Sequence, residues 1–123
     1  ARPAAPRFVL LALALVTPLV AACGSSMQPP TDRLSSTEAA VRAAEELGAE
    51  RDPQAALHLK FANDQAAQAR RLMSQGEHER ADIVLQRARS DAELAIVLTR
   101  ERAAKTEAAQ ARENLRRSSP ESR

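Results

Sequence analysis

Small apolar residues recur every three or four positions along most of this chain, which is the spacing of one face of an α-helix. The clearest run gives a predicted helix over residues 53–75. Its apolar stripe consists of Leu59, Ala62, Ala66, Ala69 and Met73. A second run gives a predicted helix over residues 77–115, with a stripe of Ala81, Leu85, Ala88, Ala92, Ala95 and Thr99.

The residues at the ends of these runs support the same division. Asp52-Pro53 is a favourable helix start, because Asp caps free amides and Pro suits the first helical position. Gly76 is expected to end the helix with a positive φ and to reverse the chain. A shorter first helix is predicted over residues 37–47, capped by Ser35 or Ser36 and closed by Gly48.

The predicted fold class is therefore all-α, with an Ala-rich antiparallel helical hairpin or a three-helix arrangement and a long C-terminal helix. The helical domain is placed at residues 36–115. Beyond Thr99 the apolar residues are almost all Ala, so this part of the helix has little to pack. It is expected to be a solvated extension, helped by pairs such as Glu101 with Lys105. Residues 116–123 are expected to form a disordered tail.

Residues 1–22 have a different composition from the rest. Arg2 and Arg7 precede an apolar run, and small residues lead up to the only cysteine in the segment Leu19-Val20-Ala21-Ala22-Cys23. A basic start, an apolar stretch and small residues before a cut site are typical of a secretory signal peptide. Ending at a cysteine, the segment resembles the lipobox of bacterial lipoproteins. That resemblance implies that Cys23 is acylated and becomes the mature N-terminus.

The alternative for residues 8–22 is an uncleaved membrane helix. This run has 15 residues and contains Thr17 and Pro18, whereas a spanning helix needs about 20 apolar residues. Residues 23–35 then form a predicted flexible tether containing Pro29-Pro30. The lipoprotein resemblance implies a location in the bacterial cell envelope, facing the periplasm. Gly24 follows the cysteine in place of the Asp that retains enterobacterial lipoproteins in the inner membrane, which favours the outer membrane.

Charge changes the picture once the signal segment is removed. The whole chain has 18 Lys+Arg and 16 Asp+Glu. Residues 1–22 hold two of the basic residues and none of the acidic ones, so the remainder has 16 of each. A balanced chain offers no basic face for phosphates, and the absence of Trp and Tyr removes base-stacking platforms. We therefore expect no nucleic-acid partner.

Candidate catalytic and metal-binding residues are few. His58 and His78 are the only histidines, and a hairpin turning at Gly76 would keep them far apart, so no shared metal site is expected and each is assigned to the surface. The carboxylates alternate with arginines in the manner of solvated helix faces. The predicted class is a protein that is not an enzyme, with no cofactor.

Two surfaces are candidates for partners. One is the Ala-rich face beyond Thr99, and the other is an Arg-rich edge, for which solubility is the competing explanation. That edge consists of Arg70, Arg71, Arg87 and Arg89. A structural or adaptor protein held to the membrane through Cys23 is the leading hypothesis, with an envelope protein or a homo-oligomer as partner. A self-assembling coiled-coil spacer and a peptide-binding module are the alternatives.

Two resemblances follow from these residues. Gly76, Ala81, Leu85 and Ala88 are spaced like the turn and second helix of a tetratricopeptide repeat, but only one such hairpin is present. More broadly, the run from the first helix through Pro53-x-x-Ala56, the Ala69-to-Gly76 turn and the Ala81-to-Ala92 ladder resembles the bacterial envelope family called domain of unknown function 4398. This second resemblance implies an Ala-rich helical fold and an envelope location, and it implies no activity.

Overall fold

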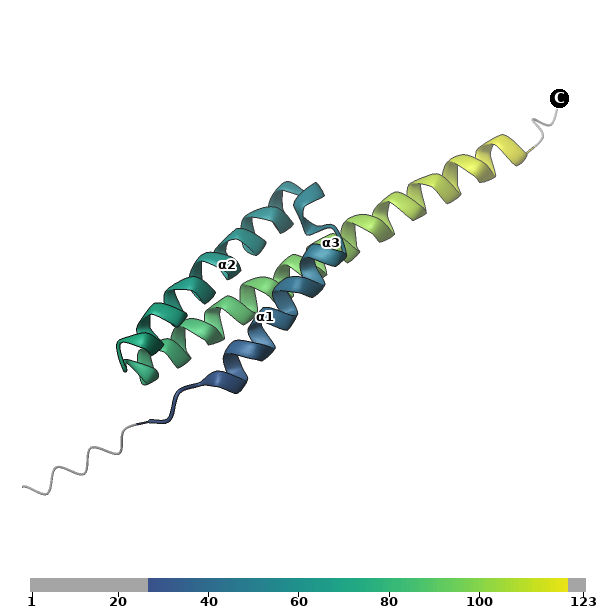
Figure 1. Cartoon of the computed structure of the whole chain (residues 1–123). Coiled ribbons are helices and arrows are strands. Elements are labelled where there is room, and N and C mark those ends of the chain that lie inside the picture. Colours follow the sequence, from purple (N-terminus) through teal and green to yellow (C-terminus); the bar gives the residue numbers. More distant parts are fainter. Residues whose placement is uncertain (1–26, 120–123) are drawn as a thin grey trace, which may run out of the picture.

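The computed structural model describes residues 27–119. Its elements are α1 (Thr31–Glu46), the short 3-10 helix η1 (Ala49–Arg51), α2 (Pro53–Ser74) and α3 (His78–Ser118). Helices α2 and α3 form an antiparallel hairpin, and α1 lies against the first half of α3 and beside α2 (Figure 1). The all-α prediction, with a long C-terminal helix, is confirmed.

Helix α1 begins six residues earlier than predicted, at Thr31, directly after Pro30. The predicted caps are wrong, because Ser35 and Ser36 lie inside the helix and their hydroxyls donate to the carbonyl oxygens of Asp32 and Arg33 at 2.9 and 3.0 Å. Such back-bonding lets a serine sit in a helix without capping it. Residues 31–35 therefore belong to the helical body and not to the tether.

Both glycines end helices as the sequence predicts. Gly48 and Gly76 have φ values of 81° and 77°, the left-handed conformation that costs glycine little. A Cβ built on Gly76 would meet nothing within 4 Å, so only the backbone conformation requires glycine there. The carboxylate of Asp52 accepts hydrogen bonds from the amides of Gln54 and Ala55 at 2.9 and 3.0 Å, which confirms its predicted role as the cap of α2.

The core between α2 and α3 is a seam of alanines. Ala62, Ala69, Ala88 and Ala92 are completely buried, and such small side chains let the two helix axes approach closely. Leucines fill the remaining space in two clusters. The cluster beside the turn contains Ala69, Leu72, Ala81 and Leu85, and the one at the other end is built around Val41, Leu59, Ala92 and Ala95.

Helix α1 is joined to this hairpin by polar contacts as well as by Val41. The guanidinium of Arg33 pairs with Asp82 of α3, and Glu38 accepts a hydrogen bond from Arg70 of α2 at 2.6 Å. The hydroxyl of the buried Thr37 lies 2.8 Å from the carbonyl oxygen of Arg33 and 3.4 Å from that of Leu85. These contacts fix the first turns of α1 to both helices of the hairpin.

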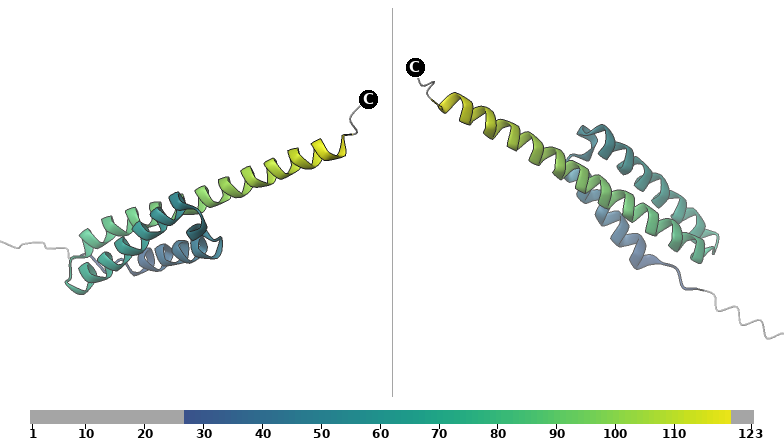
Figure 2. Two further views of the ribbon diagram at one scale, coloured as in Figure 1. Left: turned by 90° about the horizontal axis from the view of Figure 1, so that it is seen from above. Right: turned by 180° about the vertical axis from the view of Figure 1, so that it is seen from behind.

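Helix α3 is much longer than its partners and continues alone past the end of the bundle (Figure 2). Its 41 residues span about 60 Å at 1.5 Å per residue. From Glu101 to Ser119 every residue is exposed. The helix ends at Ser118, three residues later than predicted, and Glu113 pairs with Arg117 at 3.0 Å in its last turns. Residues 116–118 are therefore helical. The predicted tail beyond them at 120–123 lies outside the described residues.

We call residues 31–98 the body and residues 99–118 the extension. The body is a three-helix bundle, and the extension is a single exposed helix that leaves it at the end opposite the α2–α3 turn (Figure 1). The helix α3 runs through both parts. It is packed against α1 and α2 in the body and is exposed beyond Thr99 in the extension.

Candidate functional site

The most specific polar arrangement in the body joins α2 to α3 on the side away from α1. Nδ1 of His58 lies 2.8 Å from Oδ1 of Asp91, and Nε2 of Gln65 donates to Oδ2 of the same carboxylate at 2.7 Å. The ring of Phe61 meets the imidazole edge-on, with centroids 6.1 Å apart. Both oxygens of Asp91 are thus engaged from α2, which sets the register of the two helices.

The sequence did not predict this polar cluster. His58 was assigned to the surface, but only 28 % of its side chain is exposed, and the side chain of Asp91 is 22 % exposed. The signal was available, because His58, Phe61 and Gln65 share one face of α2 and Asp91 lies on the facing side of α3 at the matching distance from Gly76. These contacts join α2 to α3, which is the geometry of a structural contact.

The two histidines are not brought together. His58 lies in the second turn of α2, whereas His78 is the first residue of α3, beside the hairpin turn. Nδ1 of His78 is buried and has no hydrogen-bond partner among the described residues. Across residues 27–119, no group of three or more His, Cys, Asp and Glu side chains is placed to hold a metal ion.

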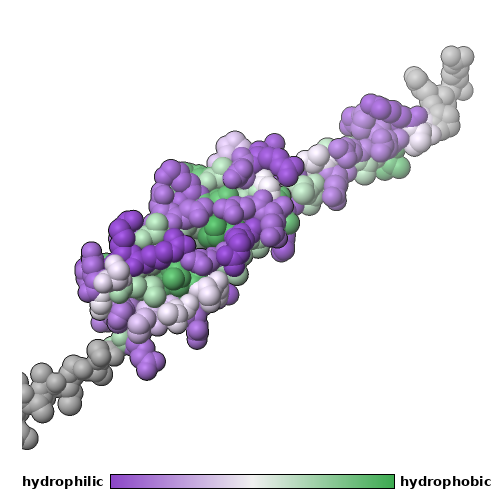
Figure 3. Space-filling view, viewed as in Figure 1, coloured by the Kyte–Doolittle hydropathy of each residue, from purple (hydrophilic) through white to green (hydrophobic). Residues whose placement is uncertain are grey.

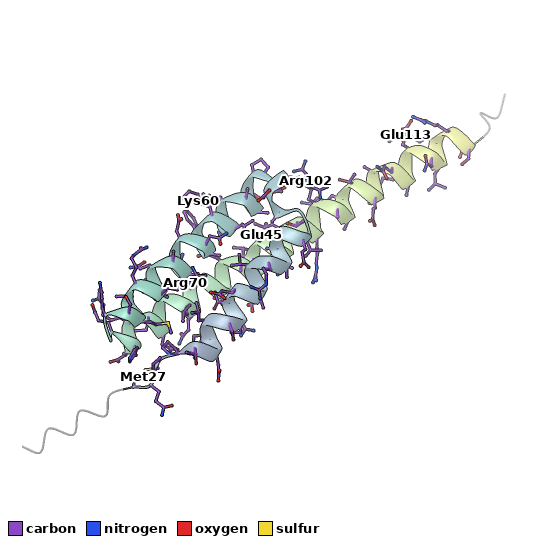
Figure 4. All side chains as sticks on the ribbon, viewed as in Figure 1. Met27, Glu45, Lys60, Arg70, Arg102 and Glu113 are labelled. Atoms are coloured by element: carbon purple, nitrogen blue, oxygen red, sulfur yellow. The ribbon has the colours of Figure 1, made fainter. Side chains whose placement is uncertain are left out.

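A second site lies where α3 leaves the body. Arg102 donates to the carbonyl oxygen of Arg51 at 2.6 Å and pairs with the carboxylate of Asp52 at 3.3 Å (Figure 4). An open hollow of about 420 Å³ lies beside this contact, between Leu47, Gly48 and the first turns of the extension at Thr99 and Thr106. Arg102 thus fastens the base of the extension to the loop between α1 and α2.

Asp52 is electrostatically adapted to this position. The amide of Ala55 lowers the pKa of the Asp52 carboxyl from its usual 3.8, partial desolvation opposes that effect, and the amide of Gln54 and the guanidinium of Arg102 lower the pKa further. In the extension, the hydrogen bond to Glu101 raises the pKa of Lys105. The predicted Glu101–Lys105 pair is confirmed, at 2.6 Å.

The predicted Arg-rich edge is not a single surface. Arg70 projects from α2 toward α1 (Figure 4), where it pairs with Glu38. Arg87 instead lies with Gln68, Leu72 and Arg80 along a shallow groove of α2 and α3 that α1 does not line. Arg89 pairs within its own helix with Glu93 at 2.7 Å. These arginines come from two different helices, and the helical turn directs their side chains to different sides of the body.

The surface of the body seen in Figure 3 is largely hydrophilic, with hydrophobic side chains showing between the helices. The extension has charged side chains around an Ala-rich helix, and all of its residues beyond Arg100 are exposed. No helix formed by residues 27–119 combines the length and the apolar character needed to cross a bilayer. Cys23, the predicted lipidation site, lies outside the described residues, so the acylation remains a prediction.

Comparison with known proteins gives one match. The family model described as domain of unknown function (DUF4398) matches residues 32–111, which cover α1, α2 and most of α3. No curated protein and no solved structure matches the chain. The matched range includes all of the body except Thr31, and the extension as far as Ala111.

Proposed function

Because the chain belongs to the DUF4398 family, whose description assigns no activity, we propose from its own residues that it is a lipid-anchored structural or adaptor protein of the bacterial cell envelope without catalytic function. The observation that carries the proposal is the segment Leu19-Val20-Ala21-Ala22-Cys23 at the end of a basic and then apolar leader. Acylated Cys23 would hold the chain to the membrane, with the helical body facing the periplasm.

The fold suits a protein that is held at one end. Thr31 starts α1 at the end of the body that carries the α2–α3 turn, where Leu34 packs against the Leu72 and Leu85 cluster. The extension leaves from the opposite end (Figure 1). A chain anchored at Cys23 would therefore present its turn end to the membrane and its extension away from it.

The length of the connection keeps the body near its anchor. Cys23 and Thr31 are eight residues apart, and eight extended residues reach at most about 28 Å. One acyl chain gives only marginal binding, so stable attachment needs two or more chains on the processed N-terminus. Gly24 favours delivery to the outer membrane. A single copy would then stand on that membrane as a rod.

The polar groups of the body serve its shape, which supports a role without catalysis. The carboxylates of Asp91 and Asp52 are both engaged in contacts between elements, with His58 and Gln65 in one case and with Arg102 and two amides in the other. An enzyme needs groups preorganised around a reacting atom. Here the preorganised groups hold one helix against another.

The test is to replace the anchor and follow the protein. Cys23→Ser in the full chain should abolish incorporation of labelled palmitate and should move the protein out of the membrane fraction or leave the precursor uncleaved. Ser26→Ala, three residues away, is the matched control and should be labelled and processed normally. Normal processing and membrane attachment of the Cys23→Ser variant would refute the proposal.

A further inference from the structure

Helix α3 carries a second stripe of positions on the side opposite its core seam. The stripe repeats at alternating steps of three and four residues over three heptads. It consists of Leu94, Val97, Glu101, Ala104, Ala108, Ala111 and Leu115. At 100° per residue these positions centre on the side of α3 that points away from Ala88 and Ala92. We call them the outer stripe.

The outer stripe is apolar except for Glu101, and no described residue covers it. Leu94, Val97 and Leu115 are 40 %, 56 % and 66 % exposed, and they are among the large apolar side chains that residues 27–119 leave exposed to water. Heptad spacing of apolar residues sustained over three repeats, with charged neighbours, is the pattern of a helix that packs against another helix. The alanines permit a close approach.

The distribution of charge between the body and the extension indicates which helix packs on the outer stripe. The body holds 9 Lys+Arg and 12 Asp+Glu, a net charge of −3, whereas the extension holds 6 Lys+Arg and 3 Asp+Glu, a net charge of +3. The extension of one copy is therefore complementary to the body of another. In a two-fold symmetric dimer, the extension of each copy would contact the body of the other, so this charge complementarity would be used twice.

The ion pairs within the chain leave specific charges available. In the extension, Arg102, Lys105 and Arg117 pair with Asp52, Glu101 and Glu113. Arg100 and Glu107 form no ion pair with any residue between 27 and 119. They flank the outer stripe on one side and lie seven residues apart.

We propose that a second copy of this chain docks on the outer stripe with its α3 antiparallel, in the register that sets Val97 against Ala108 of the second copy. The same register places Leu94 against the second copy's Ala111, and Arg100 beside the second copy's Glu107. Each contact occurs twice, by symmetry. Residues 90–115 overlap over about 38 Å.

The charges select this orientation over the parallel one. A parallel pair in register would face Glu101 with the second copy's Glu101 and would bring Arg100 beside the second copy's Lys105, two like-charge contacts. The antiparallel pair replaces both contacts, because Glu101 then faces Ala104 and Arg100 meets Glu107. It also separates the two bodies, each with its net negative charge, and brings the Arg-rich tip of each extension to the other body.

The inference goes beyond anchoring, because pairing along α3 needs no acyl chain. Combined with the proposed attachment at Cys23, it would place the two anchored ends of the dimer at opposite ends of a rod, about 75 Å apart at 1.5 Å per residue. With both anchors in one membrane, such a dimer would lie along the membrane surface, whereas a single copy would stand on it.

A charge exchange tests the orientation. The mass of the full chain in detergent is measured by analytical ultracentrifugation over a range of concentrations. Arg100→Glu and Glu107→Arg should each weaken dimerisation about tenfold, since two attractive contacts become repulsive, and the double variant should restore it. Glu113→Arg, outside the stripe, is the matched control. A strengthened dimer in Arg100→Glu would indicate parallel pairing, and no dimer in the unmodified chain would refute the proposal outright.

Disulfide trapping tests the register in the cell envelope. A full chain carrying both Val97→Cys and Ala108→Cys should form a covalent dimer under mild oxidation. In the proposed register, the thiol at position 97 of each copy faces the thiol at position 108 of the other copy. Each single variant should stay monomeric, as should Val97→Cys with Ala109→Cys, which turns the second thiol away. Dimers of the single variants, or none in the first double variant, would overturn the register.

The unmodified chain separates this inference from the proposed function. If Cys23 were not acylated, its free thiol in the unmodified chain would react with a maleimide reagent after denaturation, and the anchoring proposal would fail. The trapping of Val97→Cys with Ala108→Cys would still report on the outer stripe, because the antiparallel dimer keeps the two Cys23 residues too far apart to form a disulfide with each other.

Discussion

The body and the extension are both rich in alanine along α3, but only the body buries these alanines. Both present alanines at heptad spacing along α3, yet Ala88, Ala92 and Ala95 are completely buried, whereas Ala104 is exposed. The difference is the presence of a facing helix. Helix α2 lies antiparallel to α3 along the body, and its first residue, Pro53, marks the level beyond which α3 has no neighbouring helix among residues 27–119. An alanine ladder is therefore a core only where a second helix covers it.

The largest effect is expected when one alanine is enlarged in each part, which tests whether only the body packs its alanines. Ala88→Leu would overpack the seam between α2 and α3 and should cost about 1–3 kcal/mol of unfolding free energy. Ala104→Leu, its matched control in the extension, should change the unfolding free energy of the body by less than about 0.5 kcal/mol. Thermal melts of both variants measure the contrast, and a neutral Ala88→Leu would mean that the seam is wrongly assigned.

The next largest effect is expected at the hairpin turn. Gly76→Val should destabilise the body by about 1–2 kcal/mol, because a β-branched residue resists positive φ. The space around Gly76 is open, so no steric clash adds to that cost. Glu77→Ala, next to it, serves as the control. Chemical denaturation gives both values, and an unchanged midpoint for Gly76→Val would contradict the assigned turn.

A smaller loss should follow from opening the polar cluster. His58→Ala removes one of the two partners of Asp91 and should cost about 1 kcal/mol, the typical net value of such a hydrogen bond. Lys60→Ala, whose pair with Asp64 is on the solvent side of the same helix, should cost less. Equal losses in the two variants would show that the cluster adds nothing to the register of α2 and α3.

The smallest effect concerns the cap at the base of the extension. The folded-state pKa of Asp52 is depressed, so its charge stabilises the fold above the usual value of 3.8 and this contribution is lost as pH falls through the lower folded value. Asp52→Asn keeps a capping side chain and removes the charge. Melts of the two proteins should therefore differ at neutral pH and converge in acid. A difference independent of pH would exclude the charge as its cause.

The helices of this chain could be predicted because their signals are local. Asp52-Pro53, Gly48 and Gly76 determine backbone geometry within a few residues, and all three act as expected. The start of α1 was missed because it depends on distant contacts. Arg33 pairs with Asp82 and Leu34 packs beside Leu72, and these contacts extend the helix back to Thr31.

The candidate site was harder to predict for the same reason. His58 looks solvated in the sequence, and only the antiparallel register brings Asp91 and Gln65 to it. The prediction of the Arg-rich edge was wrong, because Arg70 on α2 and Arg87 on α3 lie on different sides of the hairpin. Cys23 is a purely local signal, and its role remains a proposal from the sequence.

The contrast between body and extension is tested most directly by amide hydrogen exchange on the full chain in detergent at two protein concentrations. Protection in α2 and the first half of α3 should be independent of concentration, because the body packs against itself. Protection from Ala104 to Leu115 should rise with concentration, because a lone exposed helix is marginal in water and pairing would cover the outer stripe. An extension that exchanges at one fast rate at both concentrations would contradict the account.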